Sequence, residues 1–456
     1  MKLNQFTSNR VPQQLARYCI RFINRLIAPD LREEVLGDLH ERYLKPVKLH
    51  GKAKATMRCL LEALVYIRPA FIKRQKSEYP SIGRQSAVQR PDPFNNPDMI
   101  GNYFKIAFSL LLVTSLAATA QKPSPEKQAD AFIFRKMQEG HITGLSLAVV
   151  KNGKVIKATG YGLANVETRT AATGATVYQI GSVSKQIVSA AIMILQQDGK
   201  LNITDKVSRY IPEAPAAWKD ITLQRLLNHT AGLPLDIPAF DPYKIQTDSA
   251  LTGSLFPVPL LYAPGDSLSY SNAAYFVIAD VIRRISGMPW NEFISKRIFQ
   301  PLNMTSTRTT TTTELVKDRA RGYNVKMGIT INAEAWIPVR PSGAFLSTVG
   351  DMAKWDAVLY GNAILNEESK RQLWSPAKGN TGWEVAYGLG WGLSPFQGHK
   401  RVFHNGGMPG FSADIERFID DKLTIIVLCN TGGVEADHLA LAVAGFYNKS
   451  LQVKGP

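Results

Sequence analysis

The chain has 456 residues, of which 45% are hydrophobic and 20% are charged, and its formal net charge is +17. This composition is that of a globular protein and excludes wholesale disorder, while the length predicts two or three structural units. The three cysteines, Cys19, Cys59 and Cys429, are widely spaced, which excludes a disulfide framework and a cysteine metal site. Cys429 lies in an apolar run, so we expect a buried thiol.

The N-terminal part is the most basic. Residues 1–98 hold 18 Lys and Arg residues against 9 Asp and Glu residues, a net charge of +9. Such a segment is typical of contact with nucleic acid or an acidic membrane surface, although a basic soluble domain would also show it. Helical apolar spacing in residues 1–76 predicts a small helical domain, and the polar residues 77–98 predict a linker.

Residues 99–120 form a hydrophobic segment. Its apolar core, residues 106–118, is shorter than the ~20 residues of a spanning helix and suits a signal peptide. Ala118-Thr119-Ala120 has the small-x-small pattern of a cleavage site.

This segment leaves two main alternatives for the location of the protein. Met99 could start a secreted protein that is released after cleavage near Ala120. Otherwise residues 1–98 stay in the cytoplasm, as the positive-inside rule favours, and residues 103–120 anchor the protein in the membrane. In both cases we expect the region after residue 120 to lie on the periplasmic side. A buried helix of a soluble protein is the remaining alternative.

The sequence of residues 121–456 predicts one large folded domain. Strand pairs with tight turns are predicted near both ends of this region, and helices lie between them. This order predicts the α/β (α+β) class, with an antiparallel sheet flanked by helices and an inserted, mostly helical region. The expected strands are Leu145–Val150, Val155–Gly160, Ser412–Phe418 and Leu423–Cys429, and the expected helices are Gln186–Gln197, Asn272–Ile285, Trp290–Phe299 and Glu435–Tyr447.

The first chemical motif joins Ser182 and Lys185, just ahead of a predicted apolar helix. Residues three apart share a helix face, and a neutral lysine amine can take the proton of a serine nucleophile. The apolar residues that follow would desolvate the amine and lower its pKa. The same spacing at Ser124–Lys127 and Ser375–Lys378 opens no long apolar helix, so the spacing alone is not specific.

Two further motifs follow in chain order. Tyr270 and Asn272 stand where a predicted helix begins, and there a phenol can relay protons and an amide can hold a substrate carbonyl. His404 follows a short predicted strand, Arg401–Phe403, and begins the glycine-rich stretch 404–411. Glycines there would leave backbone N–H groups free as oxyanion donors. A structural histidine is the alternative for His404.

In this order the three motifs resemble those of the serine β-lactamase-related family, in its branch of class C β-lactamases, DD-peptidases and esterases. The resemblance covers roughly residues 121–456, and the three motifs together are highly specific. It implies the same mixed fold. Supporting landmarks are Leu226–Pro234, Pro341–Ala344 and Tyr387–Trp391.

The resemblance implies a role for each residue. Ser182 would be acylated, and Lys185 would deprotonate it with help from Tyr270. His404 would replace the lysine of the Lys-Thr-Gly motif common in β-lactamases, and its pH-dependent charge argues against fast β-lactam hydrolysis. The substrate would be held by Asn272, Asn405 and Gly406. The oxyanion would be held by the backbone N–H groups of Ser182 and Gly407. The remaining landmark residues, His229, Asp351 and Trp391, would be structural.

The resemblance therefore implies a serine hydrolase that forms an acyl-enzyme on Ser182 and acts on an amide, peptide or ester. The substrate could be a D-amino-acid peptide, a β-lactam or a small ester. We expect no metal or cofactor, because the histidines lack ligand spacing. A small-molecule or peptide substrate and the membrane are the expected partners, without nucleic acid. The alternative is a membrane-tethered binding or sensor protein with a degenerate hydrolase pocket.

The first 108 or so residues have a second, less specific resemblance. Residues 30–43, 53–72 and 102–108 are similar to the prefix region ahead of certain bacterial ABC-transporter permeases. The rest of a permease is absent, since no further long apolar stretch follows. This resemblance implies a membrane location without transport.

Overall fold

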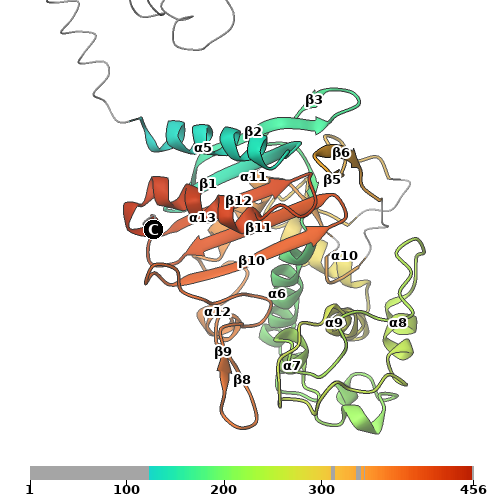
Figure 1. The fold of residues 1–456 in the computed structure, drawn as a ribbon. Coiled ribbons are helices and arrows are strands. Elements are labelled where there is room, and N and C mark those ends of the chain that lie inside the picture. The colour runs from blue at the N-terminus through green and yellow to red at the C-terminus, as the bar shows by residue number, and fades with distance from the viewer. Residues whose placement is uncertain (1–122, 310–313, 335–339, 344, 454–456) are drawn as a thin grey trace, which may run out of the picture. The chain divides into compact units, whose positions relative to one another are not determined.

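The computed structural model describes residues 123–309, 314–334, 340–343 and 345–453, which form a sheet between helical layers and a helical region beside it (Figure 1). The predicted helical domain 1–76, the linker 77–98 and the hydrophobic segment 99–120 lie outside the described residues and stay predictions. Among the residues that are described, no helix is both long and apolar enough to cross a membrane.

The central sheet has six antiparallel strands in the order β10-β11-β12-β1-β2-β3. Strands from the two ends of the region pair at its middle, where β1 lies between β12 and β2 (Figure 1). This confirms the predicted antiparallel sheet completed from both ends. Its strands are β1 Gly144–Lys151, β2 Lys154–Asn165, β3 Thr170–Ala171, β10 Arg401–Met408, β11 Phe411–Phe418 and β12 Leu423–Cys429.

Local sequence explains this sheet. The turn between β1 and β2 is Asn152-Gly153, and both residues have left-handed φ angles, 52° and 71°, that these residue types adopt most readily. Strands β11 and β12 are buried along their whole length because helices cover both faces, and their apolar runs fit this environment. Cys429 is buried in β12 as expected.

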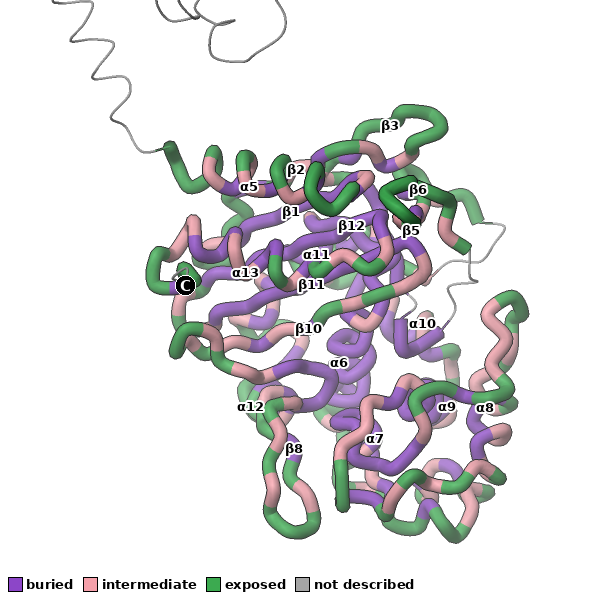
Figure 2. The backbone as a smooth tube through the Cα atoms, in the orientation of Figure 1, coloured by how far each residue is buried: buried purple, intermediate pink, exposed green. Residues whose placement is uncertain are grey.

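Helices cover the two faces of the sheet separately. On one face α5 (Pro125–Glu139) and α13 (Ala436–Tyr447) contact one another, and α13 packs on β11 and β12. On the other face α11 (Val349–Val358) packs on β1 and β12. Strands β1, β11 and β12, which lie between these layers, are almost entirely buried (Figure 2).

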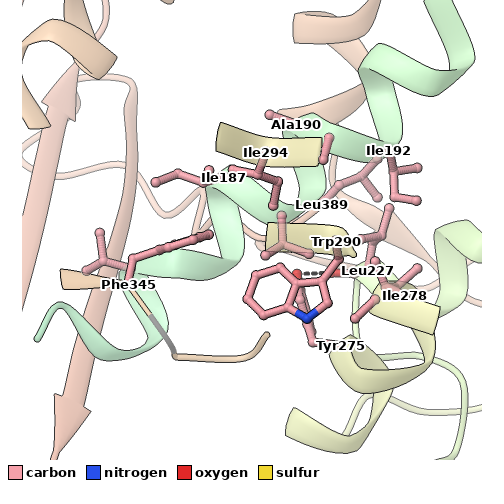
Figure 3. Packing of buried hydrophobic residues seen from close by; sticks show 14 of the residues in the cluster. Ile187, Ala190, Ile192, Leu227, Tyr275, Ile278, Trp290, Ile294, Phe345 and Leu389 are labelled. Atoms are coloured by element: carbon pink, nitrogen blue, oxygen red, sulfur yellow. Dashed lines mark hydrogen bonds between the residues drawn. The ribbon is translucent and has the colours of Figure 1, made fainter. Parts of the chain in front are cut away.

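The inserted helical region is built around α6 (Ser184–Gln197), whose residues 184–195 are all buried. Helix α9 (Asn272–Ser286) packs against α6, and apolar side chains from both helices surround Trp290 (Figure 3). The hydroxyl of Tyr275 donates to the carbonyl of Leu227 over 3.0 Å, which ties α9 to α7. The other helices are α7 Leu223–Leu227, α8 Asp248–Ser254, α10 Trp290–Ile294 and α12 Glu367–Leu373.

The remaining strands form three short pairs, which connect the larger elements. They are β4 Tyr178–Gln179 with β7 Leu346–Ser347, β5 Tyr323–Lys326 with β6 Ile329–Asn332, and β8 Ala377–Lys378 with β9 Glu384–Val385.

Three predicted elements differ from the structure. The strand expected at Arg401–Phe403 runs on to Met408, because Gly406 and Gly407 still pair with β11 and this pairing outweighs the low strand propensity of glycine. The helix expected over Trp290–Phe299 is α10 followed by a π-helical turn from Ser295. The strand expected at Val155–Gly160 also continues further, to Asn165 in β2, and the other predicted strands and helices are confirmed to within about two residues.

Candidate active site

Ser182 lies in a tight turn between strand β4 and helix α6. The turn, Gly181–Val183, is 3-10 helical, and Ser182 keeps part of its surface exposed at the start of an otherwise buried helix. Gly181 has a left-handed φ of 52°, and a Cβ there would lie 2.7 Å from the amide nitrogen of Gly407. A glycine is therefore required for the turn to hold Ser182 against β10.

Lys185 follows in the first turn of α6 and is completely buried. Its Nζ lies 3.0 Å from Oγ of Ser182, 2.8 Å from Oδ1 of Asn272 and 2.8 Å from the carbonyl oxygen of Ser342. Two of these partners only accept, so a neutral amine can give them its two hydrogens and direct its lone pair at the Ser182 hydroxyl. The contacts thus suit a neutral base beside Ser182.

Electrostatics favour the same state. Burial, and then the positive charge of Arg340, lower the pKa of Lys185 well below its usual value. This is the direction predicted from the apolar residues of α6.

Tyr270 stands just ahead of α9, next to the N-cap residue Ser271, whose hydroxyl accepts from the Ala274 N–H at 3.1 Å. Nζ of Lys185 lies 4.7 Å from the centre of the Tyr270 ring. Burial raises the pKa of Tyr270, and a hydrogen bond with Ser182 offsets part of this rise. The structure therefore brings a protonated phenol to the predicted nucleophile.

Asn272 is oriented by contacts on both sides of its amide. Its Oδ1 accepts from Lys185, and its Nδ2 donates to Oδ1 of Asp236 over 3.0 Å. The same carboxylate oxygen accepts from Arg340 over 2.8 Å. No sequence motif identifies Asp236 or Arg340, although both lie within two residues of landmark stretches, because only the folded chain brings them to Asn272.

Strand β10 is the edge strand of the sheet and passes directly over the Ser182 turn. A Cβ at Gly406 would lie 2.1 Å from the carbonyl oxygen of Ile180 and 3.0 Å from the amide nitrogen of Ser182. Asn405 and Gly407 are exposed beside it. The backbones predicted to form the oxyanion site therefore lie together.

His404 is buried, and both of its ring nitrogens have partners. Nε2 lies 2.9 Å from the hydroxyl of Tyr387, and Nδ1 lies 2.6 Å from the carbonyl oxygen of Asn405. The Tyr387 hydroxyl also lies 3.1 Å from Nε2 of His229, whose Nδ1 accepts from the Ser271 N–H over 3.1 Å.

These contacts determine the protonation of both histidines. Because Nδ1 of His229 accepts, its Nε2 carries the hydrogen and donates to Tyr387. Tyr387 can then donate to Nε2 of His404, which leaves Nδ1 of His404 to donate to Asn405. When His404 is neutral, each donor in this chain from His229 to the Asn405 carbonyl has one acceptor.

The predicted pH-dependent charge of His404 is therefore wrong for the physiological range. Burial, and then the charge of Lys185, lower the pKa of His404 to about 3. The pKa of His229 is also lowered, chiefly by burial. Desolvation of the imidazole rings is the main cause of both lowered pKa values, and the sequence motif did not reveal that His404 would be buried.

Asp351 and Trp391, the other two residues expected to be structural, have contacts within the protein. Oδ2 of Asp351 accepts from the Ser306 N–H over 2.8 Å and from the Thr307 hydroxyl over 3.0 Å. Trp391 is buried with its ring centre 6.3 Å from that of Trp374. In the described parts of the chain, no group of three or more His, Cys, Asp or Glu residues could hold a metal ion.

Comparisons with known proteins agree with this geometry. The beta-lactamase family model matches residues 129–446. Penicillin-binding protein 4* of Bacillus subtilis (strain 168) is 28% identical over 321 residues, which cover 65% of this chain and 70% of that protein. The family match begins at residue 129, so it gives no support to the permease resemblance of the first 108 or so residues.

Solved structures show the same fold. An octameric penicillin-binding protein homologue from Pyrococcus abyssi superposes with a TM-score of 0.64 at 26% identity, over 70% of this chain and 77% of that one. D-amino acid amidase from Ochrobactrum anthropi SV3, solved with D-phenylalanine, superposes with a TM-score of 0.61 at 22% identity, over 71% and 97%. The chain belongs to the beta-lactamase family and is a serine hydrolase.

Proposed function

We propose that this protein hydrolyses amide, peptide or ester bonds through an acyl-enzyme on Ser182. The observation that carries the proposal is the placement of the buried Lys185 amine, whose pKa burial lowers well below its usual value, 3.0 Å from the Ser182 hydroxyl. Its other two contacts are carbonyl oxygens, so its lone pair is directed at the nucleophile.

The residues support an ordinary two-step acyl transfer. Lys185 takes the Ser182 proton while Oγ bonds to the substrate carbonyl carbon, and the oxyanion lies between the backbone N–H groups of Ser182 and Gly407. The carbon–nitrogen or carbon–oxygen bond then breaks, and the leaving group receives the proton through Tyr270. Water next attacks the acyl carbon, releases the acid and restores the Ser182 hydroxyl. Asn272 holds the amide of the acyl portion.

The neutral state of His404 favours amides and esters over β-lactams as substrates. A β-lactam carries a carboxylate that a cation at this position would attract, and His404 offers none near neutral pH. Asn405 and Gly406 remain available to contact the substrate backbone.

Covalent labelling tests the nucleophile. We expect a fluorophosphonate to label Ser182, located by intact mass and peptide mapping, and Ser182→Ala to abolish both labelling and hydrolysis. Parallel labelling by a fluorescent penicillin would indicate a DD-peptidase or β-lactamase, separated by the lifetime of the adduct. If neither reagent labels the protein, the degenerate-pocket alternative is correct.

We also propose that residues 99–120 direct the catalytic domain to the periplasmic side. The short apolar core followed by Ala-Thr-Ala supports this proposal. N-terminal sequencing of the full-length product after cell fractionation tests it. A new N-terminus near residue 121 in the periplasmic fraction would indicate cleavage, and an intact chain in the membrane fraction would indicate an anchor.

A further inference from the structure

One charged group beside the nucleophile has no part in the acyl transfer described above. The loop after α7 is fastened to the start of α9, because the Ser271 hydroxyl donates to the Pro234 carbonyl over 2.7 Å and the Asn272 N–H donates to the Leu235 carbonyl over 2.6 Å. This places Asp236 against Asn272, where its Oδ1 accepts from the side-chain amide.

The carboxylate and its cationic partner differ in exposure. The Asp236 side chain is 49% exposed, while that of Arg340 is only 7% exposed. The Arg340 guanidinium is also 4.7 Å from the ring centre of Phe240 and 3.2 Å from the Ser342 hydroxyl. A substrate therefore meets the carboxylate and not the guanidinium.

The contacts of Asp236 also leave one of its oxygens for a substrate. Both assigned donors, from Asn272 and Arg340, reach Oδ1, and within the described residues no protein donor is assigned to Oδ2. The nearby Lys185 is completely buried, and His404 is buried with a pKa of about 3, so neither side chain presents a positive charge to solvent near pH 7. The exposed charge on the Asn272 side of the site is thus negative.

We propose that Asp236 binds the α-ammonium group of the substrate, so that the enzyme acts on amides, peptides or esters of amino acids with a free α-amino group. This inference rests on the proposed function, in which Asn272 holds the acyl portion. In such substrates the ammonium is one carbon from the scissile carbonyl and lies on the acyl side. A charge-assisted hydrogen bond to Oδ2 would select it over an acylated or uncharged group.

Matched substrates test the proposal on the full-length protein. We would compare kcat/KM for an alanine p-nitroanilide with a free amine, its N-acetyl derivative and the α-hydroxy analogue, in both enantiomers. For the wild type we expect the free amine to be preferred by about ten- to a hundredfold, the range for a charged hydrogen bond.

Three variants separate charge from position. Asp236→Asn keeps an Oδ1 acceptor for Asn272 and Arg340 but removes the charge, so the preference should fall to within about threefold of unity. Asp236→Glu should retain a preference of at least about fivefold. Asp241→Asn removes an equal charge in the same loop, where Asp241 pairs with Lys244, and should leave the preference unchanged.

The outcomes also separate the two proposals. Fluorophosphonate labelling of Ser182 with no amine preference, or with an undiminished preference in Asp236→Asn, would overturn the role of Asp236 and leave the proposed function intact. A preference for N-acyl substrates would overturn it too and assign the site to Arg340. Failure to label Ser182 in the wild type would overturn both.

Discussion

At the residue scale, the protonation state of the Lys185 amine determines the pH range in which Ser182 can react. A protonated amine would have no lone pair for the Ser182 hydroxyl, so the rate must fall as pH drops through the Lys185 pKa. Because burial lowers that pKa, kcat/KM for a neutral ester should rise along a limb with its midpoint well below the ~10.4 of a free lysine. A midpoint near 10.4 in the measured pH profile would contradict a desolvated base.

His404 should leave no trace in the same profile between about pH 5 and 9. Its pKa of about 3 lies below that window, so its charge does not change there. A second limb near pH 6.5 that disappears in His404→Gln would show instead that the ring titrates in solution.

Tyr387 is the residue that joins the two buried histidines. Tyr387→Phe removes the hydroxyl that both Nε2 atoms contact and leaves two buried ring nitrogens without a partner. We expect the free energy of unfolding in urea to fall by about 1–3 kcal/mol. Tyr447→Phe is the matched control, since no partner within the described residues is assigned to its buried hydroxyl, and it should change stability by less than about 0.5 kcal/mol. Equal losses would refute the joining role.

At the scale of elements, the distance between β10 and the Ser182 turn determines the geometry of the oxyanion site. Gly406→Ala would place a Cβ 2.1 Å from the Ile180 carbonyl oxygen, so the strand must move away from Ser182. We expect acylation by a fluorophosphonate to slow by about 10²-fold or more, the effect of losing one oxyanion donor.

A second glycine provides the control for this change. Gly253 lies in α8, and a Cβ there would meet nothing within 4 Å. Gly253→Ala should leave acylation unchanged and stabilise the protein by up to about 1 kcal/mol. If Gly406→Ala acylates as fast as Gly253→Ala, the close approach of β10 is not needed for catalysis.

At the scale of the whole molecule, the sheet buries two carboxyl groups beneath α13. Asp414 and Glu416 are two residues apart in β11, so they point to the same face of the sheet, and both are completely buried. Both carboxylate oxygens of Asp414 lack a hydrogen-bond partner among the described residues. Burial raises the pKa of Asp414 well above its usual range and that of Glu416 to about 8, where Arg401 opposes the rise and Asp437 adds to it.

Raised carboxyl pKa values make stability depend on pH. Between about pH 4, where unfolded carboxyls titrate, and about pH 8, the folded chain holds protons that the unfolded chain releases. The free energy of unfolding should therefore fall as pH rises through this window.

Asp414→Asn tests this sign, because asparagine resembles the protonated acid and does not titrate. Relative to the wild type, the variant should gain roughly 1–3 kcal/mol in unfolding free energy between pH 5 and pH 8, measured by urea denaturation. Asp420→Asn, which changes an exposed carboxylate in the same hairpin, is the control for the loss of a surface charge. A constant difference for Asp414→Asn would show that the group is ionised in the folded protein.

Much of this molecule is determined by sequence alone. The Asn152-Gly153 turn and the apolar runs of β1, β11 and β12 specify the sheet, because turn geometry and burial act locally. The three motifs also predicted that Ser182, Lys185, Tyr270 and Asn272 meet, and the structure brings them together. The lowered pKa of Lys185 followed from the apolar helix around it.

Tertiary structure alone decided which charged and neutral side chains surround Ser182 and Lys185. Asp236 and Arg340 are 104 residues apart, and no local pattern marks their ion pair or its unequal exposure. His404 is neutral because burial and Tyr387 determine its protonation, while its motif suggested a charge that varies with pH. The physical reason is common to both cases. Desolvation and long-range pairing depend on which segments pack together, and that is a property of the folded chain.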